Sequence, residues 1–379
     1  MRIARPDSSE YDNIQRFLED VYGHAFNYFS SCYPRVWKKQ YADFTNIFVL
    51  KDRGKIVSLV RIFPLETVQD GINMNLAGIG AVSTDYRCRG KGYMTELLHY
   101  SFKEMERQEF PLSVLGGDRH RYGNFGYENG GRVVDVTVSA RGLKNRGMKS
   151  VDTRRCGDCD RKNLARMMKV YNSLRYRTER TIDEFQEICR RLGTAVYYAG
   201  EGDRFAYVAV NATEIRDGSR RILEFAGSDE TAMGILMHLG ERFGFTSFSL
   251  SFPEFHEIPE DILTSASSWN VYSAMMIKII SLKDTLRQFS KQRDFSFPDG
   301  EEITLTIRNK ESAVISKKSG VLRIHGGRGR NEAAMNETEM VRLLFGISFR
   351  APAGTEKTTL QLLKTFLPFN LYLGHLDHI

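Results

Sequence analysis

The chain has 379 residues, which predicts about two or three domains that each bury a core. With 41% hydrophobic and 27% charged residues, its composition is that of an ordinary globular protein. The sequence shows neither a long apolar run nor a signal peptide, so we expect a cytoplasmic protein that makes no membrane contact.

The net charge of +7 could indicate nucleic-acid binding, but the basic residues are spread along the chain. The short basic clusters at 154–155 and 328–330 lack the interleaved aromatic residues of a platform for single strands. Nucleic-acid binding is therefore a minor interpretation, and we expect no nucleic-acid partner.

The first elements of the chain predict a sheet. Residues 1–7 are typical of a strand that runs into a helix. Two apolar runs, 47–50 and 56–62, flank the turn 51–54 and predict a hairpin. A third apolar run, 76–82, predicts a strand that leads directly into a glycine-rich turn.

That turn carries the pattern Arg87-x-x-Gly90-x-Gly92 and is followed by an amphipathic helix. A helix N-terminus has unpartnered backbone N–H groups and a partial positive charge, so a phosphate placed there satisfies both. The two glycines tolerate positive φ and close approach of a ligand, while Arg87, Arg89 and Lys91 add positive charge. Neither a Walker loop nor a dinucleotide pattern fits. The pattern predicts a pyrophosphate site, with an ordinary basic turn as the alternative.

Further along, apolar residues recur at helical spacing from Met94 to Met105, residues 112–115 predict a strand, and 122–127 reads Tyr-Gly-Asn-Phe-Gly-Tyr. This order of hairpin, strand, Arg/Gln-x-x-Gly-x-Gly/Ala loop, helix, strand and Tyr-x-x-Phe-Gly-Phe/Tyr element resembles the GCN5-related N-acetyltransferases (GNAT). The chain length and the last motif resemble the Eis-like branch of that family. In that branch, an active acetyltransferase domain precedes a degenerate copy and a sterol-carrier-like domain.

The resemblance implies an α/β (α+β) protein with tandem GNAT folds, whose mixed central sheets are flanked by helices, and a small α+β domain at the end. We place the catalytic domain at 1–143, the degenerate GNAT-like domain at 144–282 and the sterol-carrier-like domain at 283–379. The C-terminal tail of the third domain is expected to insert toward the active site.

The second unit repeats the element order of the first, with a predicted hairpin at 195–199 and 205–210, a strand at 222–225, a helix at 229–242 and a strand at 247–252. Its strand-to-helix loop is short and acidic and would repel a pyrophosphate. We therefore expect this unit to form a wall of the site.

The last hundred residues predict a small α+β domain, with strands near 303–307 and 321–325 and helices at 337–345 and 358–366. A lipid-carrying function does not follow from this pattern, because an ordinary core explains its leucines equally well.

The resemblance also implies the chemistry. Acetyl-CoA is the expected cosubstrate, and its amine partner attacks the thioester directly. The residues expected to bind acetyl-CoA are Ala81, Val82, Arg87, Cys88, Arg89, Gly90, Lys91 and Gly92. The backbone N–H of Val82 would stabilise the oxyanion, and Tyr122 matches the general acid of the Eis-like proteins. Tyr127 is the rival, although a tyrosine at its position often packs in a core.

In the Eis-like branch the terminal carboxylate receives the proton of the amine, which makes the α-carboxylate of Ile379 the candidate base. The tail 368–379 is apolar and aromatic enough to be inserted into the body. The alternative is a last strand with an exposed end, and Asp377 or His378 could then take the role of the base.

The acceptor is expected to be a primary amine of a small molecule, such as the aminoglycosides acetylated by Eis-like proteins. Phe26 and Trp37 lie in the helical region that forms the acceptor wall in this superfamily, although such residues are more often core. The alternatives are a protein or peptide lysine acetyltransferase, and a module that binds acyl-CoA or lipid without turnover. A homo-oligomer is expected from the resemblance alone.

Cysteine usage agrees with a reducing compartment, because the chain has five cysteines in an odd and sparse set. Cys156 and Cys159 could be a metal or redox pair, because they have the spacing of two zinc ligands. No second Cys pair or nearby His pair completes a tetrahedral set, which favours an incidental turn. We therefore expect reduced thiols and no metal.

Overall fold

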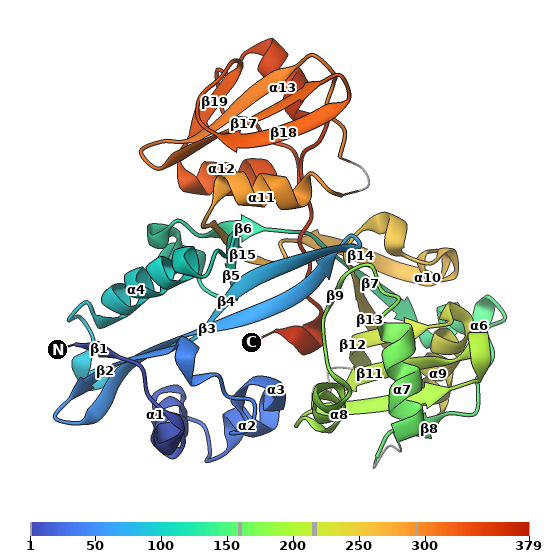
Figure 1. The fold of residues 1–379 in the computed structure, drawn as a ribbon. Coiled ribbons are helices and arrows are strands. Elements are labelled where there is room, and N and C mark those ends of the chain that lie inside the picture. Colours follow the sequence, from blue (N-terminus) through green and yellow to red (C-terminus); the bar gives the residue numbers. More distant parts are fainter. Residues whose placement is uncertain (1, 158–160, 214–217, 293–294, 379) are drawn as a thin grey trace.

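The structure is a computed structural model that describes residues 2–157, 161–213, 218–292 and 295–378. Two mixed sheets lie side by side, and a smaller α+β domain sits above them (Figure 1). The predicted fold class, tandem mixed sheets flanked by helices, is confirmed.

The first sheet has the order β1-β2-β3-β4-β5-β15-β6, with β9 paired to β3. Its strands are β1 (Ile3–Ala4), β2 (Ile47–Asp52), β3 (Lys55–Gln69), β4 (Ile72–Thr84), β5 (Leu112–Leu115), β6 (Glu128–Gly130), β9 (Arg177–Thr178) and β15 (Met275–Ile279). Its helices are α1 (Tyr11–Tyr22), α2 (Tyr28–Cys32), α3 (Pro34–Trp37), α4 (Tyr93–Arg107) and α5 (Arg119–Tyr122).

Both faces of this sheet are covered, which explains why β2 and β3 have apolar runs without polar alternation. Ile47 and Val49 pack under α1 to α3, whereas Phe48 and Leu50 point to the opposite face and pack with α4. Side chains alternate along a strand, so one run of apolar residues supplies two cores.

The second sheet has the order β14-β7-β13-β12-β11-β10-β8. Its strands are β7 (Val133–Ser139), β8 (Arg154–Arg155), β10 (Thr194–Ala199), β11 (Ala206–Asn211), β12 (Ser219–Gly227), β13 (Ser247–Phe252) and β14 (Ala266–Tyr272). Its helices are α6 (Ala140–Asn145), α7 (Arg161–Tyr171), α8 (Ile182–Arg190), α9 (Asp229–Phe243) and α10 (Glu260–Ser265).

The third sheet has four strands in the order β18-β17-β16-β19. These strands are β16 (Glu302–Ile307), β17 (Glu311–Lys318), β18 (Val321–Gly326) and β19 (Glu332–Met335). They pack with α11 (Leu282–Phe289), α12 (Glu337–Phe345) and α13 (Lys357–Leu363). Among the helices that the structure describes, none is long and apolar enough to cross a membrane.

The two large sheets exchange strands. β7 precedes the expected domain boundary at residue 143 but pairs with β13 and β14 of the second sheet. In return, β15 comes back from the second unit and pairs between β5 and β6 of the first. The boundaries at 143 and 282 therefore do not separate the sheets, because each sheet contains a strand from the other side of the boundary.

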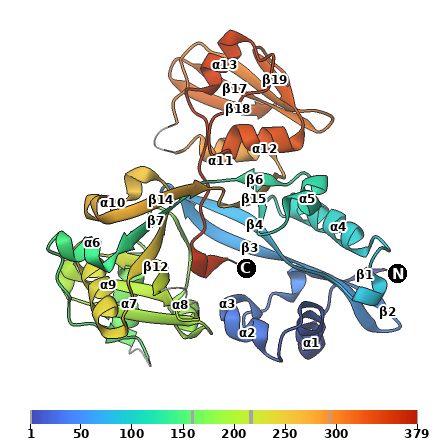
Figure 2. The ribbon, with the colours of Figure 1, turned by 180° about the vertical axis from the view of Figure 1, so that it is seen from behind.

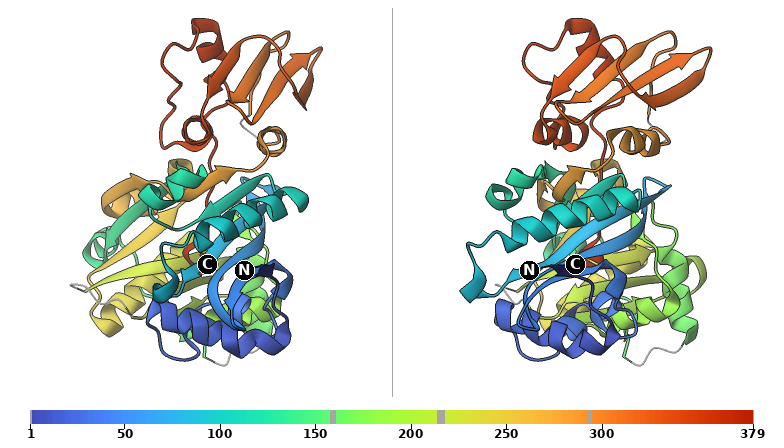
Figure 3. Two further views of the ribbon diagram at one scale, coloured as in Figure 1. Left: turned by 90° about the vertical axis from the view of Figure 1, so that its left-hand side faces the viewer. Right: turned by 60° about the vertical axis from the view of Figure 1, so that its left-hand side comes forward.

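The last segment leaves the third domain after α13 and runs down between the two large sheets (Figures 1 and 2). Asn370 accepts a hydrogen bond from the backbone N–H of Arg132 at 2.7 Å, and the backbone of Tyr372 exchanges two hydrogen bonds of 2.9 Å with the side chain of Gln69. Two further views show the same descent into the body of the molecule (Figure 3). The tail therefore joins all three parts of the chain.

Candidate functional site

A β-bulge interrupts β4 just before the glycine-rich turn. Leu59 pairs with Ser83 and Arg61 pairs with Gly80, so two residues of β4, Ala81 and Val82, stand opposite one residue of β3. Ala81 has a φ of 53°, in the left-handed region, and packs against the layer of α1 to α3. A bulge of this kind breaks the ladder and redirects the strand. It lies at Val82, the expected oxyanion donor.

Next to the bulge, the first sheet opens. β4 and β5 run parallel and pair from Leu76 to Gly78 with Leu112 to Val114. β4 then continues to Thr84 without β5 beside it in the ladder. Ligands of α/β sheets bind in such crevices at the carboxyl ends of strands.

The glycine-rich turn presents backbone amides to this opening. Gly90 and Gly92 have φ values of 77° and 79°, and an added Cβ at either position would meet open space. Both glycines are therefore needed for their backbone conformation and not for lack of room. Gly92 is the N-cap of α4 and has no side chain to cap it, so the first N–H groups of the helix face outward for an anion.

A cleft of about 510 Å³ lies at this position, within the size range of small-molecule sites. Five of the eight predicted acetyl-CoA residues line it: Val82, Cys88, Arg89, Gly90 and Gly92. The other three, Ala81, Arg87 and Lys91, are not part of its lining. The cleft also takes in Tyr22 and Arg121, which the sequence patterns did not reveal.

Arg87 instead pairs with Asp85. Its Nη2 lies 2.7 Å from Oδ2 of Asp85 and its Nε lies 3.1 Å from Oδ1. The hydrogen bonds from Arg87 lower the pKa of Asp85. The Arg87 side chain is 70% exposed, and exposed pairs are weak, so this arginine is free to turn toward a phosphate.

Tyr22 ends α1 and reaches the bulge. Its hydroxyl donates a hydrogen bond of 3.0 Å to the carbonyl of Val82. Burial raises its pKa to about 12, and the neighbouring Tyr122 adds to the shift. The Tyr22 hydroxyl therefore lies beside the bulged strand. A tyrosine at a helix end carries no motif of its own, which is why sequence reasoning missed it.

Tyr122 ends α5, whose N-cap is Asp118. Its ring is 7% exposed and lies over Gly117, where an added Cβ would come within 2.5 Å of the ring. Burial raises the pKa of Tyr122, and the neighbouring Arg121 opposes the shift. The phenol is therefore protonated at neutral pH and able to donate a proton.

Tyr127 has a different environment. It is fully buried, and its hydroxyl lies 2.6 Å from Oγ of Ser113. Burial raises its pKa, and the Ser113 hydrogen bond only partly offsets the effect. Its position is that of a core tyrosine with a satisfied hydroxyl, which favours Tyr122 as the acid.

The two expected acceptor residues lie in different environments. Trp37 is 4% exposed and packs against Phe29 and Phe63, with the guanidinium of Arg61 stacked 4.5 Å from its ring. This is a core position. Phe26 is 57% exposed, and of the two it alone offers a surface to a substrate.

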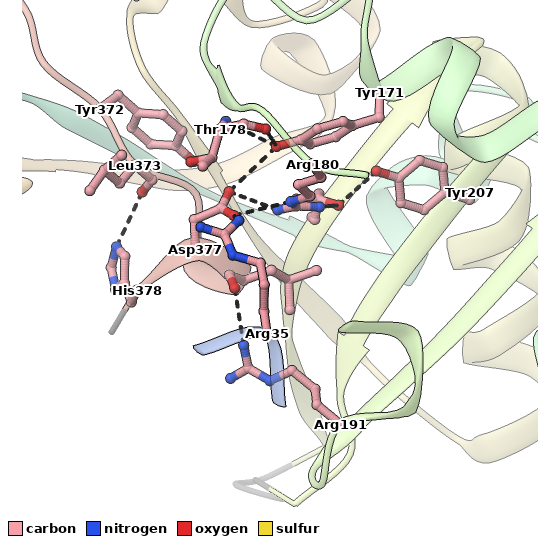
Figure 4. A network of polar contacts seen from close by, with 12 residues as sticks. Arg35, Tyr171, Thr178, Arg180, Arg191, Tyr207, Tyr372, Leu373, Asp377 and His378 are labelled. Carbon is pink, nitrogen blue, oxygen red and sulfur yellow. Dashed lines mark hydrogen bonds and ion pairs between the residues drawn. The ribbon is translucent and has the colours of Figure 1, made fainter. Parts of the chain in front are cut away.

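A buried ion-pair network holds the tail (Figure 4). Asp377 lies 2.7 Å from Arg180 and 3.0 Å from Arg35 of α3. The side chain of Arg180 is fully buried, and it also binds Glu224 at 2.7 Å, which accepts a hydrogen bond from Tyr207. Asp377 is thus occupied by two arginines. Burial alone would raise its pKa, but Arg180 and Arg35 outweigh burial and lower it.

The other two candidate bases, His378 and Ile379, lie further along the tail. Nε2 of His378 lies 3.1 Å from the carbonyl of Leu373. Ile379 lies outside the described residues, so the role of its carboxylate stays a prediction.

Acidification should loosen the tail through His375. Its Nε2 lies 2.8 Å from Oγ of Ser251, and burial, followed by the nearby His378 and Arg221, lowers its pKa from 6.5 to about 4. A buried neutral histidine contributes stability above pH 6.5 that is lost as the pH falls to about 4. We expect the free energy of unfolding to fall by on the order of 3 kcal/mol over this range.

Urea unfolding at pH 7 and pH 4.5 would measure this change, with His375→Gln as the matched variant because an amide keeps the hydrogen bond and cannot titrate. The pH dependence should shrink in the variant. An unchanged dependence would assign it to other groups.

A second prediction concerns the turn. Alanine disfavours the left-handed region by about 1–2 kcal/mol, so Gly92→Ala should turn the amides away from the cleft and weaken acetyl-CoA binding by roughly 5- to 30-fold. Gly123→Ala is the control, since Gly123 is right-handed at φ −58° and also has open space around it. Calorimetric titration measures both. Equal affinities would contradict a role for the turn.

The expectation that all cysteines are reduced thiols holds only in part. Cys32, Cys88 and Cys189 are free, but Cys156 is disulfide-bonded, which corrects the expectation of reduced thiols there. Cys159 lies outside the described residues. Within the described ranges, no three His, Cys, Asp or Glu side chains are grouped to hold a metal ion.

Comparison with known proteins agrees with this geometry. A family model for the acetyltransferase (GNAT) domain matches residues 2–130. No curated protein matches the chain significantly. Solved structures match it from end to end. A probable N-acyltransferase from Enterococcus faecalis is 17% identical over 100% of this chain and 99% of that one, with a TM-score of 0.74.

A GCN5-related N-acetyltransferase from Kribbella flavida is 16% identical over 100% of both chains, with a TM-score of 0.71. Eis1 from Mycobacterium abscessus is 10% identical over 100% of both chains, with a TM-score of 0.67. Identities this low show a shared fold alone. Residues 2–130 are thus a GNAT acetyltransferase domain, within a chain that has the fold of GNAT proteins along its whole length.

Proposed function

We propose that the protein is an N-acetyltransferase that transfers the acetyl group of acetyl-CoA to a primary amine of a small molecule. The observation that carries this proposal is the cleft of about 510 Å³, where the bulge at Val82, the left-handed turn and the uncapped start of α4 meet. Backbone N–H groups and Arg89 suit a pyrophosphate there, so the residues present fit the cosubstrate.

Acetyl-CoA supplies an acetyl group activated as a thioester. Val82 would donate its backbone N–H to the oxyanion that forms when the amine attacks the carbonyl carbon. Tyr122 would give its proton to the departing thiolate, as its buried and protonated phenol allows. Tyr22 would steady the bulge through its hydrogen bond to the Val82 carbonyl.

The base that takes the amine proton is proposed to be the terminal carboxylate of Ile379. Two observations support it. Asp377 is already neutralised by two arginines, and the tail that ends in Ile379 is anchored beside α3 by Arg35. An anchored tail also favours an enclosed small-molecule site over an open groove for a protein substrate, and favours turnover over a module that only binds acyl-CoA.

Thiol release from acetyl-CoA against a panel of amines tests the function, with aminoglycosides, small polyamines and lysine peptides as its three arms. The proposal predicts turnover with small amines and a loss of turnover without Ile379, while acetyl-CoA affinity is kept. Turnover with lysine peptides alone would identify a protein acetyltransferase. Binding of acetyl-CoA without turnover on any amine would contradict the proposal that the protein is an enzyme.

A further inference from the structure

The second sheet opens in the same way as the first. β12 and β13 run parallel and pair from Ser219 to Arg221 with Ser247 to Ser249. β12 then continues to Gly227 and β13 to Phe252 beyond the paired stretch. In the first sheet, the cleft proposed for acyl-CoA lies at the corresponding end of β4, beyond the stretch that pairs with β5. The degenerate unit has therefore kept the crevice of an active one.

A cavity of about 230 Å³ fills this opening. Its walls come from the end of α7 and the segment after it, from the ends of β12 and β13, and from the tail at Tyr372, Gly374 and Asp377. Of the described residues, none lines both this cavity and the acyl-CoA cleft. The two sites are separate.

This cavity does not suit a phosphate. Ser228 caps α9 by accepting a hydrogen bond from the backbone N–H of Thr231, and Asp229 and Glu230 occupy the first turn. The amides that bind an anion in the first unit are thus capped and surrounded by negative charge here. An acyl-CoA is excluded from this second crevice.

Aromatic rings form part of the walls instead. Tyr176 and Tyr372 meet nearly at right angles, at 86°, with centroids 6.3 Å apart. Phe225 and Phe252 form a second such pair at 75° and 5.7 Å. All four rings line the cavity, and the negative face of an aromatic ring attracts an organic cation that lies against it.

The charged residues around the rings leave a negative charge that would attract a cation. Arg175 is offset by Asp70 and by Glu257, which lies 3.3 Å away. Arg177 is likewise offset by Glu179 at 2.9 Å. Burial raises the pKa of Tyr176, Asp70, Glu254 and Glu257 raise it further, and Arg175 opposes the shift. Three carboxylates and one arginine thus act on this hydroxyl.

Among the carboxylates that line the cavity, one has no cationic partner in the described part of the chain. Asp229 lines the cavity and makes neither a hydrogen bond nor an ion pair among the described residues. Glu224 and Asp377, at the tail side, are neutralised by Arg180. Asp229 is therefore the charge available to a ligand.

We propose that the cavity between β12, β13 and the tail binds an organic ammonium ion, held against the Tyr176 and Tyr372 rings with Asp229 as its counter-charge. The cavity volume suits a small amine or the amino end of a larger molecule. Because Tyr372 belongs to the tail, an occupant contacts the same segment that Asp377 anchors.

Calorimetric titration of the full chain with choline, tetramethylammonium and n-butylammonium tests this proposal. The control ligand is 3,3-dimethyl-1-butanol, which matches the shape of choline without its charge. Cation–π contacts predict that the ammonium ions bind roughly 2- to 30-fold tighter than the neutral alcohol. Tyr176→Leu should lose most of this preference, whereas Tyr176→Phe, which keeps the ring, should retain it.

Three results would overturn the proposal: no binding of any ammonium probe, equal binding of the neutral alcohol, or displacement of choline by acetyl-CoA. The last would place the probe in the cleft of the first unit. Asp229→Asn gives an independent check, because it changes only an exposed charge and should weaken the ammonium ions but not the alcohol. Thermal melting of each variant shows whether it is folded.

Discussion

Replacing Tyr122 by phenylalanine is expected to lower kcat by roughly 10²- to 10⁴-fold, the usual contribution of a positioned proton-transfer group. The substitution removes one hydroxyl and keeps the ring that packs over Gly117, so the fold and the acyl-CoA cleft should remain intact. Thiol-release kinetics and the calorimetric affinity for acetyl-CoA separate the two effects.

Tyr127→Phe is the matched control, since both tyrosines are buried and their rings lie 6.1 Å apart. Its hydroxyl contacts Ser113, so the loss should reduce stability and leave kcat within a few-fold. A large kcat loss in Tyr127→Phe with none in Tyr122→Phe would reverse the assignment.

Replacing Arg180 by methionine is expected to lower the free energy of unfolding by about 3–5 kcal/mol. Methionine is similar in length but leaves Glu224 and Asp377 without their shared cation. Both carboxylates are almost fully buried, so neither gains much from water. Urea unfolding measures the change, and the end of the tail should be released first, because Asp377 has lost one of its two arginines.

Arg161→Met provides the control. Arg161 pairs with Asp183 at 3.0 Å, but the two side chains are 76% and 62% exposed, and such pairs contribute at most about 1 kcal/mol. The two substitutions remove the same charge at similar distances from a carboxylate. If both destabilise the chain equally, burial does not make the Arg180 network strong.

Much of the fold follows from local patterns. The apolar runs of β2 and β3 predict their hairpin, and the second hairpin, β12, α9 and β13 were expected close to their observed bounds. The bulge at Ala81 could not be foreseen, because nothing in Gly-Ala-Val marks a left-handed alanine. The exchange of β7 and β15 was also missed, since both are short apolar strands that fit either sheet.

At the site, the glycine turn was visible because helix N-termini and glycines act over a few residues. The role of Tyr22 could not be predicted, because its contact with Val82 joins residues that are 60 positions apart. The same limit applies to the Arg180 network, which pairs Arg180 with Asp377 across 197 positions. Trp37 was considered for the acceptor wall, and its stacking on Arg61 places it in the core.

The strand exchange also bears on whether either half of the chain could fold alone. A fragment that ends at residue 143 would lack β15, the strand that joins β5 to β6, and would carry β7 with no sheet to enter. Either half alone would therefore have an unpaired strand. The second unit is thus part of the architecture of the first, and we expect deletion of either unit to destabilise the other.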